Sequence, residues 1–210
     1  MNDYAKNLVL TNAEKTLDKR LLEMRDKYRE NGIPTILTDS LNELVLLSSA
    51  LKPKKILELG TSVGCSGIAL LLASKGATLY TVEKFSAAAD AAAENFKKFG
   101  LESRVKQFVG DATEVIDEVG DGFDFVFLDC NKSKYKDLFP KIKNVLVSGG
   151  VLFADNVFYR GYVTGEVKAP HRQNTIKNNM REFLRLITSD EDFITTLSDI
   201  GDGISVSYKK

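Results

Sequence analysis

Two acids and an amide in the second half of the chain are side chains of the kind that bind a hard divalent cation. Asp129 ends a strongly β-prone run, and Asp155 and Asn156 end another. If these runs form neighbouring parallel strands, their oxygen-bearing side chains lie on one rim of a sheet. Such ligands favour Mg²⁺ or Mn²⁺. The alternative interpretation is that both acids only cap the helices that follow them.

Lys132 lies three residues beyond Asp129, within reach of the same rim. Near a bound cation the pKa of its ammonium group should fall, which would suit Lys132 to act as a general base. The alternative is a solvated lysine within the basic run 132–136, which is the usual situation of a single lysine.

The segment 58–67 has the composition of a ligand-binding turn between a strand and a helix. Gly60 and Gly64 allow the backbone to turn tightly and approach a ligand, and a helix that begins near Ser66 directs free N–H groups at it. Glu83, 19 residues after Gly64, could accept hydrogen bonds from two ribose hydroxyls. The glycine spacing G-x-x-x-G-x-x-G differs from the G-x-G-x-x-G pattern of nicotinamide dinucleotide sites. The turn therefore predicts a different nucleotide-like ligand, unless its glycines serve packing alone.

The elements that would position these residues alternate between strand and helix. Five apolar runs separated by helix-prone runs predict a parallel sheet, and a hairpin around Ile200–Gly203 implies an antiparallel strand at one edge. We therefore expect an α/β, Rossmann-like, doubly wound, mostly parallel seven-stranded sheet with one antiparallel edge strand and N-terminal helices. The expected strands are 55–59, 77–82, 105–109, 123–129, 149–155, 193–197 and 204–208, and the expected helices are 12–31, 40–51, 66–75, 86–99, 112–118, 135–146 and 176–187.

Composition limits the class of protein. The 210 residues, 43% of them hydrophobic, suit one domain over 1–210, with a helical cap over 1–52 and a cofactor-binding and catalytic core over 53–210. Lys and Arg (29) balance Asp and Glu (29), so total charge favours neither a polyanionic nor a membrane partner. The two cysteines lack metal or redox spacing, and no signal peptide or bilayer-spanning run is evident. These features predict a cytoplasmic protein.

Several short motifs follow one another in a fixed order. They are Ile33-Pro34, Glu58-Leu-Gly60, Gly64-Cys-Ser66, Glu83, Gly110-Asp-Ala112, Leu128-Asp-Cys-Asn-Lys-Ser-Lys-Tyr135, Ala154-Asp-Asn156 and Ile200-Gly-Asp-Gly203. With these motifs the chain resembles the metal-dependent O-methyltransferases that include catechol and caffeoyl-coenzyme-A O-methyltransferases and a bacterial tRNA 5-hydroxyuridine methyltransferase. The resemblance runs from about Ile33 to the C-terminus, and the Asp-x-x-Lys pattern with Ala-Asp-Asn is its most specific part.

The resemblance implies S-adenosylmethionine as cofactor, Mg²⁺ or Mn²⁺ as metal and a homodimer as the assembly. It assigns cofactor binding to Ile36, Glu58, Gly60, Gly64, Ser66, Glu83, Asp111, Ala112 and Asp129, metal binding to Asp129, Asp155 and Asn156, and catalysis to Lys132 and Asp129. Two departures are evident. Cys65 stands where relatives usually have Tyr, and residues 38–42 lack the Glu-Gly-Gln pattern of the plant enzymes, which argues against a plant coenzyme-A ester as substrate.

The function expected from these features is metal-dependent methylation of a chelated hydroxyl on a catechol-like or other hydroxylated aromatic substrate. An alternative acceptor is 5-hydroxyuridine at a tRNA wobble position. It is favoured by a basic segment over 160–185 that contains Arg160, Lys168, Arg172, Lys177, Arg181 and Arg185, with His171. The same charges could instead form a solvated helix face. A nicotinamide oxidoreductase is disfavoured by the glycine spacing, and a non-catalytic nucleotide-binding module leaves Asp129, Lys132, Asp155 and Asn156 unexplained.

Overall fold

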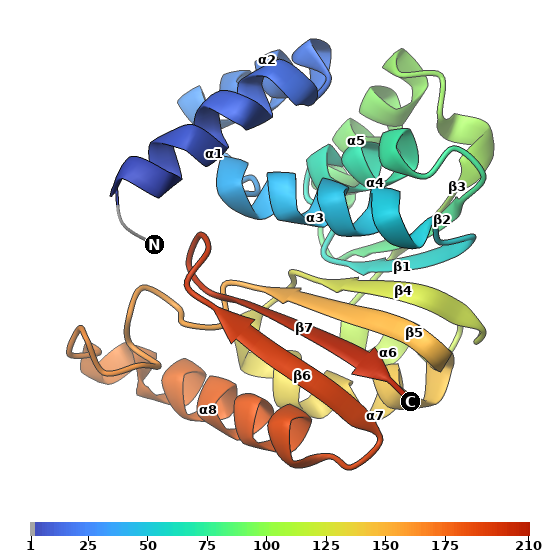
Figure 1. Cartoon of the computed structure of the whole chain (residues 1–210). Coiled ribbons are helices and arrows are strands. Elements are labelled where there is room, and N and C mark those ends of the chain that lie inside the picture. Colours follow the sequence, from blue (N-terminus) through green and yellow to red (C-terminus); the bar gives the residue numbers. More distant parts are fainter. Residues whose placement is uncertain (1–2) are drawn as a thin grey trace.

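The computed structural model describes residues 3–210, and Figure 1 shows helices on both faces of one twisted sheet. The predicted helical cap over 1–52 contains α1 (Asp3–Thr16), α2 (Lys19–Glu30) and α3 (Thr38–Leu51), and its first two residues lie outside the described part. The prediction of a single helix over 12–31 is wrong. Asp18 accepts the N–H of Arg20 at 2.9 Å and caps α2. Because Leu17 and Leu21 are both buried, the break lets two helices turn apolar side chains inward.

The described residues form one seven-stranded sheet in the order β3-β2-β1-β4-β5-β7-β6. Strands β1 to β5 pair in parallel, and β7 runs antiparallel to both β5 and β6. This confirms the predicted fold, with the antiparallel strand in the hairpin at one end of the sheet. The strands are β1 (Lys55–Leu59), β2 (Thr78–Glu83), β3 (Val105–Val109), β4 (Phe123–Leu128), β5 (Leu146–Asp155), β6 (Phe193–Ser198) and β7 (Ile204–Lys209).

Helices cover the two faces of the sheet as separate layers (Figure 1). One layer holds α1 to α3 with α4 (Cys65–Ala73) and α5 (Ser86–Lys98), and the other holds α6 (Ala112–Val115), α7 (Tyr135–Val145) and α8 (Asn174–Ser189). Short 3₁₀ turns occur at Glu102–Arg104, Lys132–Lys134 and His171–Gln173. No helix in the described part of the chain is long and apolar enough to cross a membrane.

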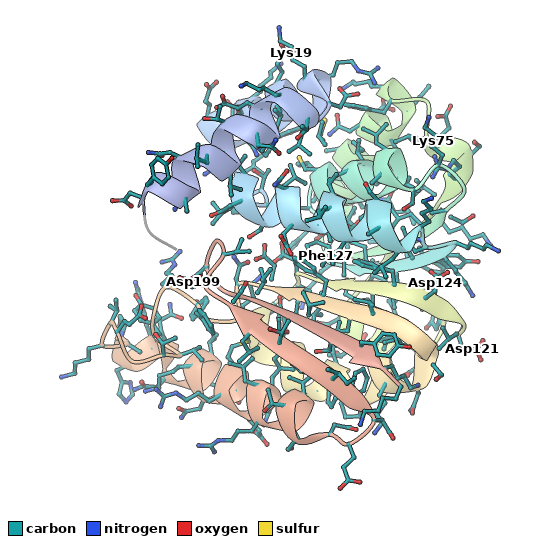
Figure 2. The ribbon with its side chains drawn as sticks, viewed as in Figure 1. Lys19, Lys75, Asp121, Asp124, Phe127 and Asp199 are labelled. Atoms are coloured by element: carbon teal, nitrogen blue, oxygen red, sulfur yellow. The ribbon has the colours of Figure 1, made fainter. Side chains whose placement is uncertain are left out.

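The central strands β1 and β4 are buried on both faces, as in other parallel sheets covered by helices. Ile56 and Phe125 join the core under α1 to α5, whereas their neighbours Leu57 and Val126 join the core under α6 to α8. Phe127, on β4, is fully buried near the centre of the molecule (Figure 2). This alternation fixes which face each side chain meets, and it leaves the strand ends free to carry polar groups.

The pairing of β4 with β5 sets the register of the strand ends that carry Asp129 and Asp155. Leu128 pairs with Ala154, so Asp129, which follows β4, and Asp155, the last residue of β5, lie side by side at the sheet end. β5 begins at Leu146, three residues before the expected start, and a register shift lies between Phe123 and Phe125 opposite it. The glycine pair 149–150, where the strand was expected to begin, lies in this irregular part of β5, and residues 146–148 extend the strand beyond the prediction. Similarly, α6 ends at Val115 rather than at 118.

Candidate active site

A cavity of about 480 Å³ opens at the carboxyl ends of β1, β2, β4 and β5, where open α/β sheets bind their ligands. It is lined by residues just before α3, by the β1–α4 turn, and by the chain that follows β2, β3, β4 and β5. The predicted residues that line it are Ile36, Gly60, Ser66, Glu83, Asp111, Ala112, Asp129, Lys132, Asp155 and Asn156. Glu58 and Gly64 do not line it. The structure therefore brings most of the predicted set to one cavity.

The β1–α4 turn passes very close to the chain after β4. A Cβ atom on Gly60 would lie 2.4 Å from the carbonyl oxygen of Asp129, and Gly60 has φ +106°. Only glycine satisfies both conditions. Gly64, with φ +86°, precedes α4 and faces the ring of Phe96 instead of the cavity. Gly60 thus allows the β1–α4 turn to pack directly against the chain after β4, while Gly64 contributes to the turn on the side away from the cavity.

Glu58 lies beneath the cavity and is fully buried. Its carboxyl group accepts the hydroxyls of Ser66 (2.5 Å) and Thr81 (2.6 Å). Burial raises the pKa of Glu58 to about 7, against the effect of these two hydrogen bonds. Glu58 therefore fixes Ser66, which does line the cavity, and does not reach the cavity itself.

Glu83 ends β2 at the cavity wall. Its carboxylate accepts the backbone N–H groups of Ser62 (2.8 Å) and Phe85 (2.9 Å). A carboxylate offers about four acceptor positions, so both oxygens can still accept hydrogen bonds from a ligand. The two backbone contacts hold the carboxylate in place between the β1–α4 turn and the start of α5.

Asp111 follows β3 and begins α6. It accepts the hydroxyl (2.7 Å) and the N–H (3.0 Å) of Thr113, and it forms an ion pair with Lys84 at 3.0 Å. These hydrogen bonds, led by that of the Thr113 hydroxyl, lower the pKa of Asp111 to about 2. The group is therefore a fixed anion at the end of the cavity next to Glu83.

Asp129 and Lys132 form a hydrogen-bonded ion pair in the cavity wall. Burial lowers the pKa of Lys132, but the negative charge of Asp129 and its hydrogen bond outweigh burial, so the pKa lies above its ordinary value. In the absence of a cation Lys132 is thus an ammonium group. From the sequence we predicted that a bound cation lowers the pKa of Lys132. Such a fall requires that the negative charge of Asp129 be compensated.

Asp155 is 1% exposed, and only one of its two carboxylate oxygens accepts hydrogen bonds from the described residues. Its Oδ1 accepts the hydroxyl of Ser40 (3.2 Å) and the N–H of Asn156 (2.8 Å), whereas Oδ2 is buried without a hydrogen-bond partner among the described residues. Burial, and then the charge of Asp129, raise the pKa of Asp155 above its ordinary value. A buried, unpartnered carboxylate oxygen beside a second carboxylate is a position that a bound cation would satisfy.

Within residues 3–210 no three His, Cys, Asp or Glu side chains cluster in an arrangement that could hold a metal. The predicted set offers two carboxylates and the amide of Asn156, whose backbone adopts φ +57°. Mg²⁺ usually keeps several waters and binds through one or two carboxylates. The donors present therefore fit a partly hydrated, hard cation.

Several cavity residues were missed by the sequence analysis. Phe85, at the rim, is 68% exposed, and Cys130 contributes to the wall. Cys65, which the sequence analysis noted at the position where relatives usually have Tyr, also lines the cavity. The sequence also gave no sign of the contact of Ser40, on α3 and outside the cavity wall, with Asp155, which lies 115 residues further along the chain. None of these types is diagnostic in isolation, and their positions depend on tertiary packing.

The basic segment over 160–185 lies outside this cavity wall. Among its cations Arg181 donates to the carbonyl of Val163 at 2.8 Å, and most of the others are exposed. Tyr159 contacts Tyr162 edge to face and donates to Gln173 at 2.9 Å. The two tyrosines therefore anchor the loop before α8, and neither forms part of the described cavity wall.

The fold and the cavity are those of an α/β protein with a ligand-sized cavity at its strand ends and with carboxylates in the cavity wall. A family model described as O-methyltransferase matches residues 11–210. The chain is 33% identical over 157 residues to a catechol O-methyltransferase of Niastella koreensis, with 71% of each chain covered. It is 25% identical over 200 residues to a caffeoyl-CoA O-methyltransferase of Populus kitakamiensis, covering 90% of this chain and 85% of the relative.

A solved structure agrees with these relatives. The O-methyltransferase TomG from Streptomyces achromogenes, in complex with SAM, superposes with a TM-score of 0.85 at 25% identity, covering 100% of this chain and 99% of TomG. The chain belongs to the O-methyltransferase family. The reaction class predicted from the motifs, S-adenosylmethionine-dependent O-methyl transfer, is thereby confirmed.

Proposed function

We propose that the protein methylates a hydroxyl group of a small, catechol-like or otherwise hydroxylated aromatic substrate, with a divalent cation held by Asp129, Asp155 and Asn156. The observation that carries this proposal is the unpartnered Oδ2 of Asp155 beside Asp129, in the same cavity as Glu83. A catechol offers two neighbouring oxygens, which suit a cation with open coordination positions.

The cofactor end of the cavity extends from Ser66 to Asp111. In this proposal Glu83 accepts the ribose hydroxyls, and Asp111 and Ala112 contact the adenine side. Ser66 and the N-terminus of α4 meet the methionyl part, where backbone N–H groups favour a carboxylate. Ile36, 6% exposed in the wall before α3, covers the cofactor. S-adenosylmethionine held by these residues would supply its methyl group to an acceptor at the end of the cavity that Asp129 lines.

The end of the cavity that contains Asp129, Asp155 and Asn156 would activate the acceptor hydroxyl. A bound divalent cation lowers the pKa of a nearby substrate hydroxyl and so favours the oxyanion near neutral pH. Asp129, Asp155 and Asn156 would hold the cation and, through it, orient the substrate oxygen towards the methyl donor. The oxygen–carbon bond forms as the sulfur–carbon bond breaks, and S-adenosylhomocysteine leaves with the sulfur electron pair.

Lys132 receives the hydroxyl proton in this proposal. Its pKa is raised while it pairs with Asp129, so it acts as a base only when that pair opens and the lysine has lost its proton. A cation bound to Asp129 would compensate the negative charge of that carboxylate, and so would remove the main contribution that raises the pKa of Lys132. A lysine that remains charged would instead stabilise the developing oxyanion by a hydrogen bond.

The tRNA wobble nucleoside 5-hydroxyuridine is the second candidate acceptor. It is supported by the largely exposed basic residues of the segment 160–185, which follows Asn156 along the chain. Positive side chains beside a site can bind the phosphates that flank a target nucleoside.

The two acceptors are separated by one assay with methyl-labelled S-adenosylmethionine and Mg²⁺. A panel of catechols and bulk tRNA from cells that lack this enzyme serve as acceptors. We expect label to enter at least one catechol and not tRNA. Transfer to tRNA alone would replace the proposed substrate class with the second candidate. The homodimer, which the resemblance implies, and the cytoplasmic location, which the sequence composition predicts, both remain predictions.

A further inference from the structure

The first turn of α3 contacts two segments that are far away in the sequence. Ser40, which is fully buried, donates its hydroxyl to Oδ1 of Asp155 at 3.2 Å. Its neighbour Asp39, 5% exposed, accepts the N–H of Gly201 at 3.1 Å. The turn therefore touches both the proposed metal rim and the hairpin between β6 and β7.

These contacts leave the Asp155 carboxylate with unequal oxygens. Oδ1 accepts two donors, the Ser40 hydroxyl and the N–H of Asn156. Oδ2 accepts none from the described residues, although it is buried. A carboxylate can rotate about its Cβ–Cγ bond, and two donors on one oxygen oppose that rotation.

We propose that Ser40 is a positioning residue that holds Oδ1 of Asp155, so that the free Oδ2 faces the cation. This inference rests on the proposed function, because the cation belongs to that proposal. Loss of the hydroxyl leaves Oδ1 with the Asn156 N–H alone, and the carboxylate then samples other orientations.

The β6–β7 hairpin keeps Ser40 in place. A Cβ atom on Gly201, which has φ +61°, would lie 2.3 Å from Oγ of Ser40. The same hairpin holds the chain after Asn156, because Val157 donates to the carbonyl of Gly203 (2.9 Å) and Phe158 to that of Asp202 (3.0 Å). Three segments thus meet around one carboxylate, and Ser40 is the side chain among them that donates to it.

Ser48 supplies a matched control on the same helix. It is also fully buried, and its hydroxyl lies 2.9 Å from that of Ser74, away from the cavity wall. Ser40→Ala and Ser48→Ala therefore each remove one buried, hydrogen-bonded hydroxyl from α3. A general loosening of the helix would affect both variants, whereas a positioning role affects only the first.

The test is Mn²⁺ binding to the protein saturated with S-adenosylhomocysteine, followed by electron paramagnetic resonance of free Mn²⁺. Wild type, Ser40→Ala, Ser48→Ala and Asp155→Ala are compared, and the Kd of S-adenosylhomocysteine is measured by calorimetry for each. We expect Ser40→Ala to raise the Mn²⁺ Kd about three- to tenfold, the effect of one hydrogen bond. Ser48→Ala should stay within about twofold. The cofactor Kd controls for displacement of α3, because such a displacement would move Ile36 and Leu37 in the cavity wall. We expect this Kd to hardly change.

The outcomes separate the two levels of the proposal. If wild type binds Mn²⁺ at a site that Asp155→Ala abolishes, and Ser40→Ala binds it equally well, the positioning role is wrong and the proposed function stands. Equal weakening in both serine variants also overturns the positioning role. If wild type shows no Mn²⁺ site that depends on Asp155, the metal part of the proposed function fails.

Discussion

Replacement of Glu58 by glutamine should remove a large part of the pH dependence of folding stability. Glu58 is fully buried, and burial raises its pKa from 4.5 to about 7. In the unfolded chain the same carboxyl group returns to its ordinary pKa. Between these two values the folded protein holds a proton at Glu58 that the unfolded chain has released.

The sign follows from this proton. Where the folded state binds more protons, the free energy of unfolding falls as pH rises. The contribution of Glu58 is therefore fully present below the unfolded pKa and is lost as pH rises through the folded pKa of about 7. A difference of two to three pKa units corresponds to a loss on the order of 3 kcal/mol.

Glutamine fits the site without this titration. Its carbonyl oxygen can accept the Ser66 hydroxyl, and its amide can donate to Thr81, whose hydroxyl can turn to Thr61, 2.6 Å away. The buried hydrogen bonds are thus retained. The variant should gain stability relative to wild type by about 3 kcal/mol from about pH 5 to about pH 8.

The measurement is urea unfolding of both proteins across this range of pH. The slope that Asp155 contributes is common to both proteins and cancels in the difference. Glu94→Gln, at an exposed position on α5, controls for the loss of one negative charge. A difference between Glu58→Gln and wild type that is independent of pH would refute the reasoning.

Three further substitutions test other parts of the account. Gly60→Ala places a Cβ 2.4 Å from the Asp129 carbonyl, so calorimetry should show at least about tenfold weaker S-adenosylhomocysteine binding, and an unchanged Kd would contradict the close approach. Lys132→Met should lower kcat about 100-fold with little change in cofactor Kd, whereas a loss below about threefold would exclude Lys132 as the base. Arg104→Ala removes donors to the carbonyls of Leu71, Ser74 and Ala77 and should lower the free energy of unfolding by about 2 kcal/mol. A wild-type urea midpoint would argue against that role.

The sheet could be predicted because its strands are short apolar runs with polar ends. β1 and β3 have the expected bounds, 55–59 and 105–109. The break at Asp18 could not be predicted in this way, because no Gly or Pro marks it and the burial of Leu17 and Leu21 decides it. Likewise, a proline usually kinks or breaks a helix, but α7 continues through Pro140, since the helix retains its buried apolar face.

The site was predictable where strand ends carry the chemistry. Asp129, Asp155 and Glu83 reach one cavity because parallel strands end at the same rim. Glu58 is also an acid near the end of a strand, but its side chain points at α4 and not into the cavity. Only its contacts with Ser66 and Thr81 reveal this. Ser40 lies 115 residues from Asp155, so no local pattern could have connected the two.

The central claim is that a divalent cation bound at Asp129, Asp155 and Asn156 activates the methyl acceptor. Its most direct test is methyl transfer to a catechol by protein freed of metal, measured in chelator and again after addition of Mg²⁺ or Mn²⁺. The account predicts that the chelator lowers the rate at least about 100-fold, that the added cation restores it, and that Asp155→Ala stays slow in both conditions. Full activity of the wild type in chelator would contradict it.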